Sequence, residues 1–246
     1  MILQYLSVLG DSPLAFLTLI SAFAFALFAG LTVHEYSHAL VADRLGDGTP
    51  RRFGRLSLNP KAHLDPIGST MIFFVGFGWA KPVPVNPSAT ANPKQTMTLT
   101  SFAGPASNVV IAGVAGFPIN AGWIPFHHPF VSPSLAGRYA ELWTSSPADL
   151  LGLFLGTVVL LNVILAVFNL LPIAPLDGFN AAVGLLPDDL SRPLAATAPW
   201  GMPILLALIF LPRFLGYDSP LFTVMSPAID LLLKAFVGNA TDLRFG

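Results

Sequence analysis

Residues 14–42 read LAFLTLISAFAFALFAGLTVHEYSHALVA and join a long apolar run directly to a cluster of ionisable side chains. The run at 14–31 is close to the roughly 20 apolar residues that a helix needs to cross a bilayer. We expect the helix to continue through Ala42, so that His34, Glu35 and His38 lie on its second half. The stretch therefore predicts a membrane-spanning helix that carries polar chemistry.

The composition of the chain favours the same class of protein. Of its 246 residues, 54% are hydrophobic and 10% are charged, whereas an average soluble domain has about 25% charged residues. So few charges cannot cover a soluble fold of this size, but lipid can cover apolar surface. The formal net charge of −1 gives no indication of a nucleic-acid partner. The absence of cysteine excludes disulfides, thiolate zinc ligands and cysteine nucleophiles.

Further apolar segments predict further spans, at about 97–119, 150–171, 203–211 and 221–237. With the first run they predict an all-α polytopic membrane protein with about five transmembrane helices. We expect one membrane-embedded domain over 1–246, with a catalytic core at about 14–180 and C-terminal helices at about 199–237. The segment before His34 has no Lys or Arg and no small-residue cleavage pattern, so we expect it to be retained rather than removed as a signal peptide.

The segment at 46–95 is rich in proline and glycine and differs from the spans around it. Its apolar part, at 67–80, is shorter than the roughly 20 residues needed to cross a bilayer. We therefore expect a short re-entrant or β-like segment that dips into the membrane and returns. The alternation at 81–85, with Pro82 and Pro84, suggests an edge-type strand, where proline is tolerated.

Basic residues are concentrated directly after the first span. They are Arg44, Arg51, Arg52, Arg55 and Lys61, whereas the N-terminal segment has none. Since cytoplasmic loops carry the excess of Lys and Arg, we expect this loop in the cytosol and the N-terminus outside. Counting spans from there brings Asp177 to the same side as His34 and His38.

His34, Glu35 and His38 form an H-E-x-x-H pattern. On a helix, residues four apart project from one face, so both imidazoles can bind one ion. Glu35, beside them, can take a proton from a bound water. Zinc is the natural ion, because it accepts nitrogen and carboxylate oxygen and keeps one position open for water at catalytic sites. A chance pattern at a helix end is the alternative, but ionisable groups on a membrane helix are costly and indicate function.

Two histidines and a water leave zinc one protein ligand short. Asp177 is the first candidate, because it follows the strongest span and lies where Pro172 and Pro175 break the helix and free backbone to line a cavity. Asp65 is the rival ligand, because it lies in a loop on the same side of the membrane. An ordinary Asp-Gly turn is the alternative explanation for Asp177.

Several motifs resemble those of the site-2 protease family of intramembrane zinc metalloproteases. The likeness covers roughly 32–180 and rests on the H-E-x-x-H pattern and a downstream Asn169-x-x-Pro172-x-x-Pro175-Leu176-Asp177-Gly178. Between these two motifs, the stretches at 54–60, 63–66, 78–87 and 103–108 are similar to the compact bacterial-type branch, which has no PDZ or CBS module.

The resemblance implies that Asp177 is the third ligand of one Zn²⁺ per chain and that Asn169 holds the substrate carbonyl or its oxyanion. It implies an intramembrane zinc endopeptidase that cuts transmembrane helices within or near the bilayer, in regulated intramembrane proteolysis. It also implies a multi-pass protein of a bacterial-type cell (inner) membrane, with the active site toward the cytosol. The expected partners are membrane lipid and a single-span transmembrane substrate, and no nucleic acid.

A substrate that has unwound could add as a strand to an extended edge of the enzyme. The candidate substrate-binding residues are therefore Lys81, Pro82, Val83, Pro84 and Val85, with a plain surface loop as the alternative. Lys81 is expected to be an interfacial anchor. Asn108 and Asn162 are expected to form hydrogen bonds between helices, and His63 is expected to be structural.

Two other functions are weighed against the peptidase: a catalytically inactive membrane scaffold and a polar-cavity transporter of the same fold. Transporters usually show internal repeats, whereas the two halves of this chain are dissimilar. A scaffold has no need of a base, so Glu35 argues for an active enzyme.

Overall fold

The computed structural model describes residues 6–75, 78–131 and 135–238. Within these residues the secondary structure is helical, with an isolated bridge between Leu64 and Ala80 and no β-strand. The prediction of an all-α fold is therefore confirmed.

Among the described residues, four helices are long and apolar enough to cross a membrane: α2 (Pro13–Arg44), α6 (Pro93–Asn120), α8 (Pro147–Asn169) and α12 (Pro220–Val237). A fifth span is counted if α10 (Asp188–Ala196) and α11 (Ala198–Leu215) act together, although the pair is bent by 65°. The prediction of about five transmembrane helices agrees with this count. The chain is a multi-pass membrane protein.

The three helices that carry the site begin where the sequence supplies a cap followed by proline. Ser12, Asn92 and Ser146 accept hydrogen bonds from the backbone N–H groups at the start of α2, α6 and α8. Each cap is followed by proline at the first helical position, where its missing N–H costs nothing. The beginning of each of these spans is thus encoded locally.

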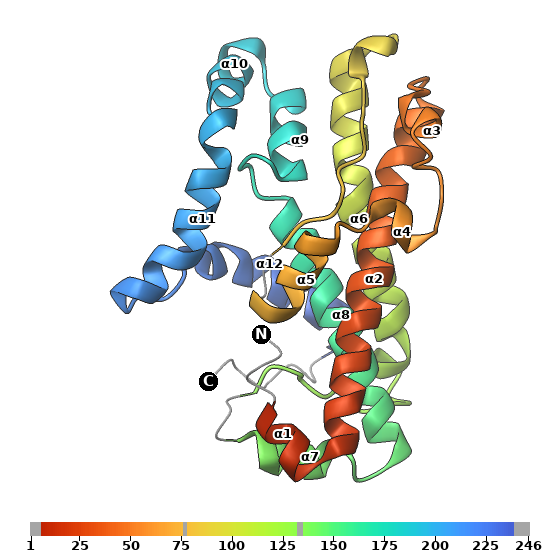
Figure 1. The fold of residues 1–246 in the computed structure, drawn as a ribbon, viewed down its shortest axis with the longest axis vertical. Helices are drawn as coiled ribbons and strands as arrows, with labels where there is room; N and C mark the ends of the chain where they lie inside the picture. The colour runs from red at the N-terminus through yellow and green to blue at the C-terminus, as the bar shows by residue number, and fades with distance from the viewer. Residues whose placement is uncertain (1–5, 76–77, 132–134, 239–246) are drawn as a thin grey trace.

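The helices α2, α6 and α8 pack against one another and form the centre of the molecule (Figure 1). The buried apolar core includes Val159, Leu160 and Val163 of α8 and Ala112 and Ile119 of α6. On its far side this core continues into α12, through Met225 and Ile229. Close packing of this kind fixes the positions of side chains on all three helices.

The helices α3 (Thr49–Arg52), α4 (Pro60–His63) and α5 (Pro66–Val75) and the short 3₁₀ helix η2 (Pro87–Ala89) lie in the proline-rich segment. Leu64 and Ala80 form an antiparallel bridge, and the Lys81 N–H donates to the His63 carbonyl over 2.7 Å. The two ends of the apolar stretch at 67–80 therefore lie close together. The chain leaves the bridge through α5 and returns to it at Ala80, as a re-entrant segment does. Gly76 and Phe77, which follow α5 in the sequence, lie outside the described residues.

The edge-type strand predicted at 81–85 is not a strand in the structure. The backbone there runs without helix, and its only ladder contact is the bridge at Ala80. Pro82 and Pro84 have no N–H to donate, so a regular ladder cannot form along this stretch.

After α8 the chain turns back on itself. The helix α9 (Asp177–Leu185) packs closely on α6, with Gly184 against Thr98, and α10 and α11 then lead away from the bundle (Figure 1). Two short helices, α1 (Leu6–Asp11) and α7 (Ala136–Trp143), lie together at the opposite end of α2. The turn between α8 and α9 is the element that positions Asp177.

Candidate metal centre

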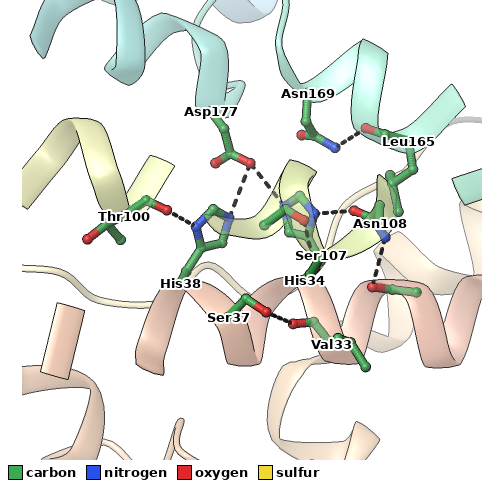
Figure 2. Close-up of polar contacts among 12 residues, drawn as sticks. Val33, His34, Ser37, His38, Thr100, Ser107, Asn108, Leu165, Asn169 and Asp177 are labelled. Carbon is green, nitrogen blue, oxygen red and sulfur yellow. Dashed lines mark hydrogen bonds and ion pairs between the residues drawn. The ribbon is translucent and has the colours of Figure 1, made fainter. Parts of the chain in front are cut away.

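His34 and His38 lie one turn apart on α2, and their rings meet edge to face with centroids 4.7 Å apart. Asp177, the first residue of α9, reaches both of them from the other side (Figure 2). Its Oδ2 lies 3.0 Å from Nε2 of His34 and 3.2 Å from Nε2 of His38. The structure thus brings together three groups that lie far apart in the sequence.

A tight turn holds Asp177 in this place. Gly178 packs so closely on the end of α8 that a Cβ there would lie 2.1 Å from the Leu170 carbonyl oxygen. Only glycine leaves room for this approach. Burial raises the pKa of the Asp177 carboxyl, but the contacts with His34 and His38 outweigh it, so the pKa lies below its ordinary value. Asp177 is therefore an anion that faces two imidazoles.

The partner of each Nδ1 atom indicates which nitrogen of the histidine ring carries the hydrogen. Nδ1 of His38 lies 2.6 Å from the Thr100 carbonyl oxygen, and Nδ1 of His34 lies 2.6 Å from Oδ1 of Asn108. A carbonyl oxygen can only accept, so each neutral imidazole carries its hydrogen on Nδ1 and a lone pair on Nε2. Hydrogen bonds of this kind orient the histidine ligands of metals.

This donor set fits zinc. Two lone pairs and a carboxylate oxygen converge, with all three atoms within 4.8 Å of one another. Without a cation these acceptors repel, whereas Zn²⁺ takes nitrogen and carboxylate ligands in this combination. Among the described residues, His34, His38 and Asp177 are the group that could hold a metal ion.

Gly104 of α6 closes the site on one side, which sequence reasoning did not foresee. A Cβ at this position would lie 2.4 Å from Nε2 of His38 and 2.6 Å from Nε2 of His34. The absence of a side chain leaves the space that the two nitrogens occupy. The signal was present in the Gly104-Pro105-x-x-Asn108 motif, which also supplies the partner of His34.

A cavity of about 660 Å³ opens beside the three groups. Glu35, which is half-buried, and Asn169, at the end of α8, line it together with His34, His38 and Asp177. The rest of the wall is largely apolar and includes Leu31, Met97, Leu165, Phe168, Met202 and Leu205. A group that reacts at the metal centre would therefore have apolar surroundings.

Asn169 is directed toward the same cavity but is engaged within its own helix. Its amide nitrogen donates to the Leu165 carbonyl over 2.9 Å (Figure 2). An amide nitrogen carries two hydrogens, so one remains for another acceptor.

The predicted substrate-binding segment reaches the cavity with part of its residues. Pro82, Val83 and Val85 line it, whereas Lys81 and Pro84 are not among the lining residues. In the described part of the chain, the N–H groups of Val83 and Val85 have no backbone partner. The middle of the segment thus has free main-chain groups beside the metal centre.

The rival ligand Asp65 lies elsewhere. Its Oδ1 accepts hydrogen bonds from the N–H groups of Ile67 and Gly68, over 3.0 and 2.8 Å, at the start of α5. It caps that helix and is not part of the metal-binding group. His63 is fully buried and its Nε2 contacts the Ser57 carbonyl over 2.6 Å, as expected of a structural residue.

Comparisons with known proteins agree with this site. The chain is 34% identical over 220 residues to “Putative zinc metalloprotease YwhC” of Bacillus subtilis, an alignment that covers 89% of this chain and 93% of the relative. It is 31% identical over 187 residues to “Putative zinc metalloprotease Rip2” of Mycolicibacterium smegmatis, which covers 74% of this chain and 64% of the relative. The Rip2 of Mycobacterium tuberculosis strain H37Rv is 27% identical over 209 residues. No family model and no solved structure matches the chain.

Proposed function

Because this chain belongs to the site-2 protease family of zinc metalloproteases, we propose that it is an intramembrane endopeptidase. Its substrates are transmembrane helices, and the peptide bond is hydrolysed within or near the bilayer. The observation that supports the proposal is the position of the metal-binding group. His34 and His38 lie on a helix that is long and apolar enough to span, and their cavity is mostly apolar.

Each residue of the site has a role in this reaction. His34, His38 and Asp177 hold the cofactor Zn²⁺, which when bound supplies Lewis-acid chemistry for a water and a carbonyl. Glu35 accepts a proton from the water whose oxygen attacks the carbonyl carbon. It then gives this proton to the amine nitrogen as the C–N bond breaks.

Asn169, at the end of α8, lines the same cavity as the base. The second hydrogen of its amide is placed to donate to the oxygen of the substrate carbonyl as negative charge develops there. A fixed donor at this position stabilises the transition state more than the ground state.

The segment at 81–85 is the proposed docking edge for an unwound substrate. Asp47 accepts a hydrogen bond from the Asn86 N–H over 2.6 Å, and the Lys81 N–H is bound to His63. Both ends of the segment are therefore held. Val83 and Val85 line the cavity, and their N–H groups have no backbone partner among the described residues. A substrate strand would use these groups, and Lys81 would anchor the segment at the interface.

The same proposal includes the setting of the enzyme. We place it in a bacterial-type cell (inner) membrane, as a compact single domain without PDZ or CBS module in these 246 residues. The basic residues after α2 support an active site that faces the cytosol, because cytoplasmic loops carry the excess of Lys and Arg. A cysteine introduced at Arg52 would then be labelled only from the cytosolic side, against a background free of cysteine.

The deciding experiment is hydrolysis by the purified full chain in liposomes, with a single-span transmembrane protein as substrate. Cleavage that stops with a chelator and returns with zinc supports the peptidase. A scaffold or a transporter of the same fold would give no cleavage under any of these conditions.

A further inference from the structure

The three spans of the centre meet at one polar junction, one turn of α2 before His34. It is formed by Gly30 of α2, Asn108 of α6 and Asn162 of α8. The side chains of Asn108 and Asn162 are 0% and 1% exposed. Polar groups so deeply buried are normally hydrogen-bonded, and both amides of the junction have partners in the structure.

Asn108 uses all of its strong hydrogen-bonding groups here. Its Nδ2 donates to the Gly30 carbonyl over 3.2 Å and to Oδ1 of Asn162 over 2.9 Å. Its Oδ1 then faces Nδ1 of His34 (Figure 2). The two hydrogens of the amide thus have two acceptors, and the oxygen has one donor.

Asn162 makes this arrangement directional. Its own Nδ2 donates to the Val158 carbonyl over 2.9 Å, so its Oδ1 must point toward Asn108. The backbone carbonyls of Gly30 and Val158 can only accept hydrogen bonds. They therefore set the orientation of both amides in the chain of hydrogen bonds that ends at His34. Without Asn162, the Gly30 carbonyl alone would hold the Asn108 amide in this orientation, and the turned amide, which presents N–H to His34, would become less unfavourable.

The orientation of the Asn108 amide affects the metal centre. When Asn108 offers its oxygen, His34 carries its hydrogen on Nδ1 and keeps the lone pair on Nε2 for zinc. If Asn108 offered N–H, the favoured tautomer would carry the hydrogen on Nε2, and that nitrogen could not bind a metal. Partners of this kind fix the tautomer of metal-bound histidines.

Gly30 supports the same junction. A Cβ at this position would lie 2.8 Å from Oδ1 of Asn162 and 3.5 Å from Nδ2 of Asn108. The close approach of three helices at this glycine is what lets the two amides meet. The junction is thus more than a contact between helices, because it ends on a group that binds metal.

We propose that Asn162 is a positioning residue that selects the zinc-binding tautomer of His34 through Asn108, although it does not itself touch the metal ligands. The proposal rests on the zinc site and not on the peptidase activity, so its test requires no substrate.

Zinc affinity of the full chain in detergent micelles, measured by competition with a chromophoric chelator, is the first measurement. Asn162→Leu keeps a similar volume but removes the acceptor, and we expect it to lower zinc affinity about tenfold, in the range known for outer partners of metal ligands. Thr157→Val is the matched control: Thr157 is equally buried on α8 but bonds only to the Leu153 carbonyl of its own helix. We expect this control to bind zinc like the parent.

A second variant separates positioning from a general loss of structure. Asn108→Asp offers His34 an oxygen whichever way it turns, so adding Asn162→Leu in that background should leave zinc affinity unchanged. If Asn162→Leu weakens zinc binding equally in both backgrounds, its role is only structural and the proposal fails.

The tautomer itself can be observed in the metal-free parent protein, by ¹⁵N NMR of its five histidines. We expect His34 with its hydrogen on Nδ1, and Asn162→Leu to populate the other tautomer. Finding the hydrogen of His34 on Nε2 in the parent protein would overturn the proposal even if no variant folds.

Discussion

The two sides of the active-site cavity differ in how firmly they are held. One side is the bundle of α2, α6 and α8, where His34, Asn108 and Asn162 are almost completely buried and hydrogen-bonded across helices. The other side is formed by the segment around Trp79 and by α11, where Trp79 and Met202 are 45% and 39% exposed. The two histidines of the candidate metal centre lie on the first side, where Asp177 reaches them from the start of α9, and the proposed docking residues lie on the second.

This difference follows from what each side must do. Ligands of a metal must be held to within about 0.5 Å, which only packed elements can ensure. A wall that admits a substrate helix must yield, and regions with few buried contacts open at low cost in free energy. Along α11, Gly201 lies against Ala174, the buried Leu205 belongs to the core, and Leu208 and Ile209 pack against it. Substitutions on the two sides should therefore have different kinds of effect.

The largest effect is expected at Asp177. Asp177→Ala removes a ligand, so the protein should lose most of its zinc and all hydrolysis, as measured by metal analysis and substrate cleavage. Asp65→Ala is the control, because Asp65 only caps α5 and should keep the metal. Full zinc content in Asp177→Ala would contradict the ligand set.

Glu35→Gln should separate chemistry from metal binding. Glu35 is the proposed base and not a ligand, so zinc content should stay at the level of the parent. Hydrolysis should fall by about 10²–10⁴-fold, which is the usual contribution of a general acid–base group. Near-normal turnover in this variant would rule out the mechanism.

Gly104→Ala tests how tightly the packed side is built. The added methyl group would overlap both Nε2 atoms, so we expect displaced histidines and at least about tenfold weaker zinc binding, as for a disturbed ligand shell. Gly113→Ala on the same helix is the matched control, because its Cβ would meet only the Phe236 ring at 3.4 Å. Equal zinc affinity in the two variants would show that the bundle yields where we expect it to be rigid.

Asp47→Ala tests the second, more exposed side of the cavity, which carries the proposed docking edge. The carboxylate of Asp47 holds the Asn86 and Thr49 N–H groups, so its loss should loosen the docking edge and leave zinc binding intact. We expect KM to rise by about tenfold with kcat nearly unchanged, since a hydrogen bond to a charged group contributes about 1.5–3 kcal/mol.

Asp43→Ala is the control for this variant, because Asp43 pairs with Arg51 and does not touch the docking edge. A fall in kcat with constant KM after Asp47→Ala would place this residue with the chemistry rather than with docking.

Much of the fold could be predicted because its signals are local. The apolar runs predicted the spans, and the short run at 67–80 predicted the return that the Leu64–Ala80 bridge shows. The prediction of a strand at 81–85 was wrong. The alternation of valine and proline indicates an extended backbone, but it does not supply a neighbouring strand to pair with. Asn108 was expected to join helices and does so, but its bond to His34 was not foreseen.

The sequence by itself determined that two histidines share one face of a membrane helix, with a glutamate beside them, because the helical period alone decides which residues lie together. Only the tertiary structure decided which groups complete the site. Asn108, Thr100 and Asp177 reach the histidines across 74, 62 and 139 residues of chain. No local period relates such positions. They meet because the close packing of α2, α6, α8 and α9 fixes where the Asn108 and Asp177 side chains and the Thr100 carbonyl lie.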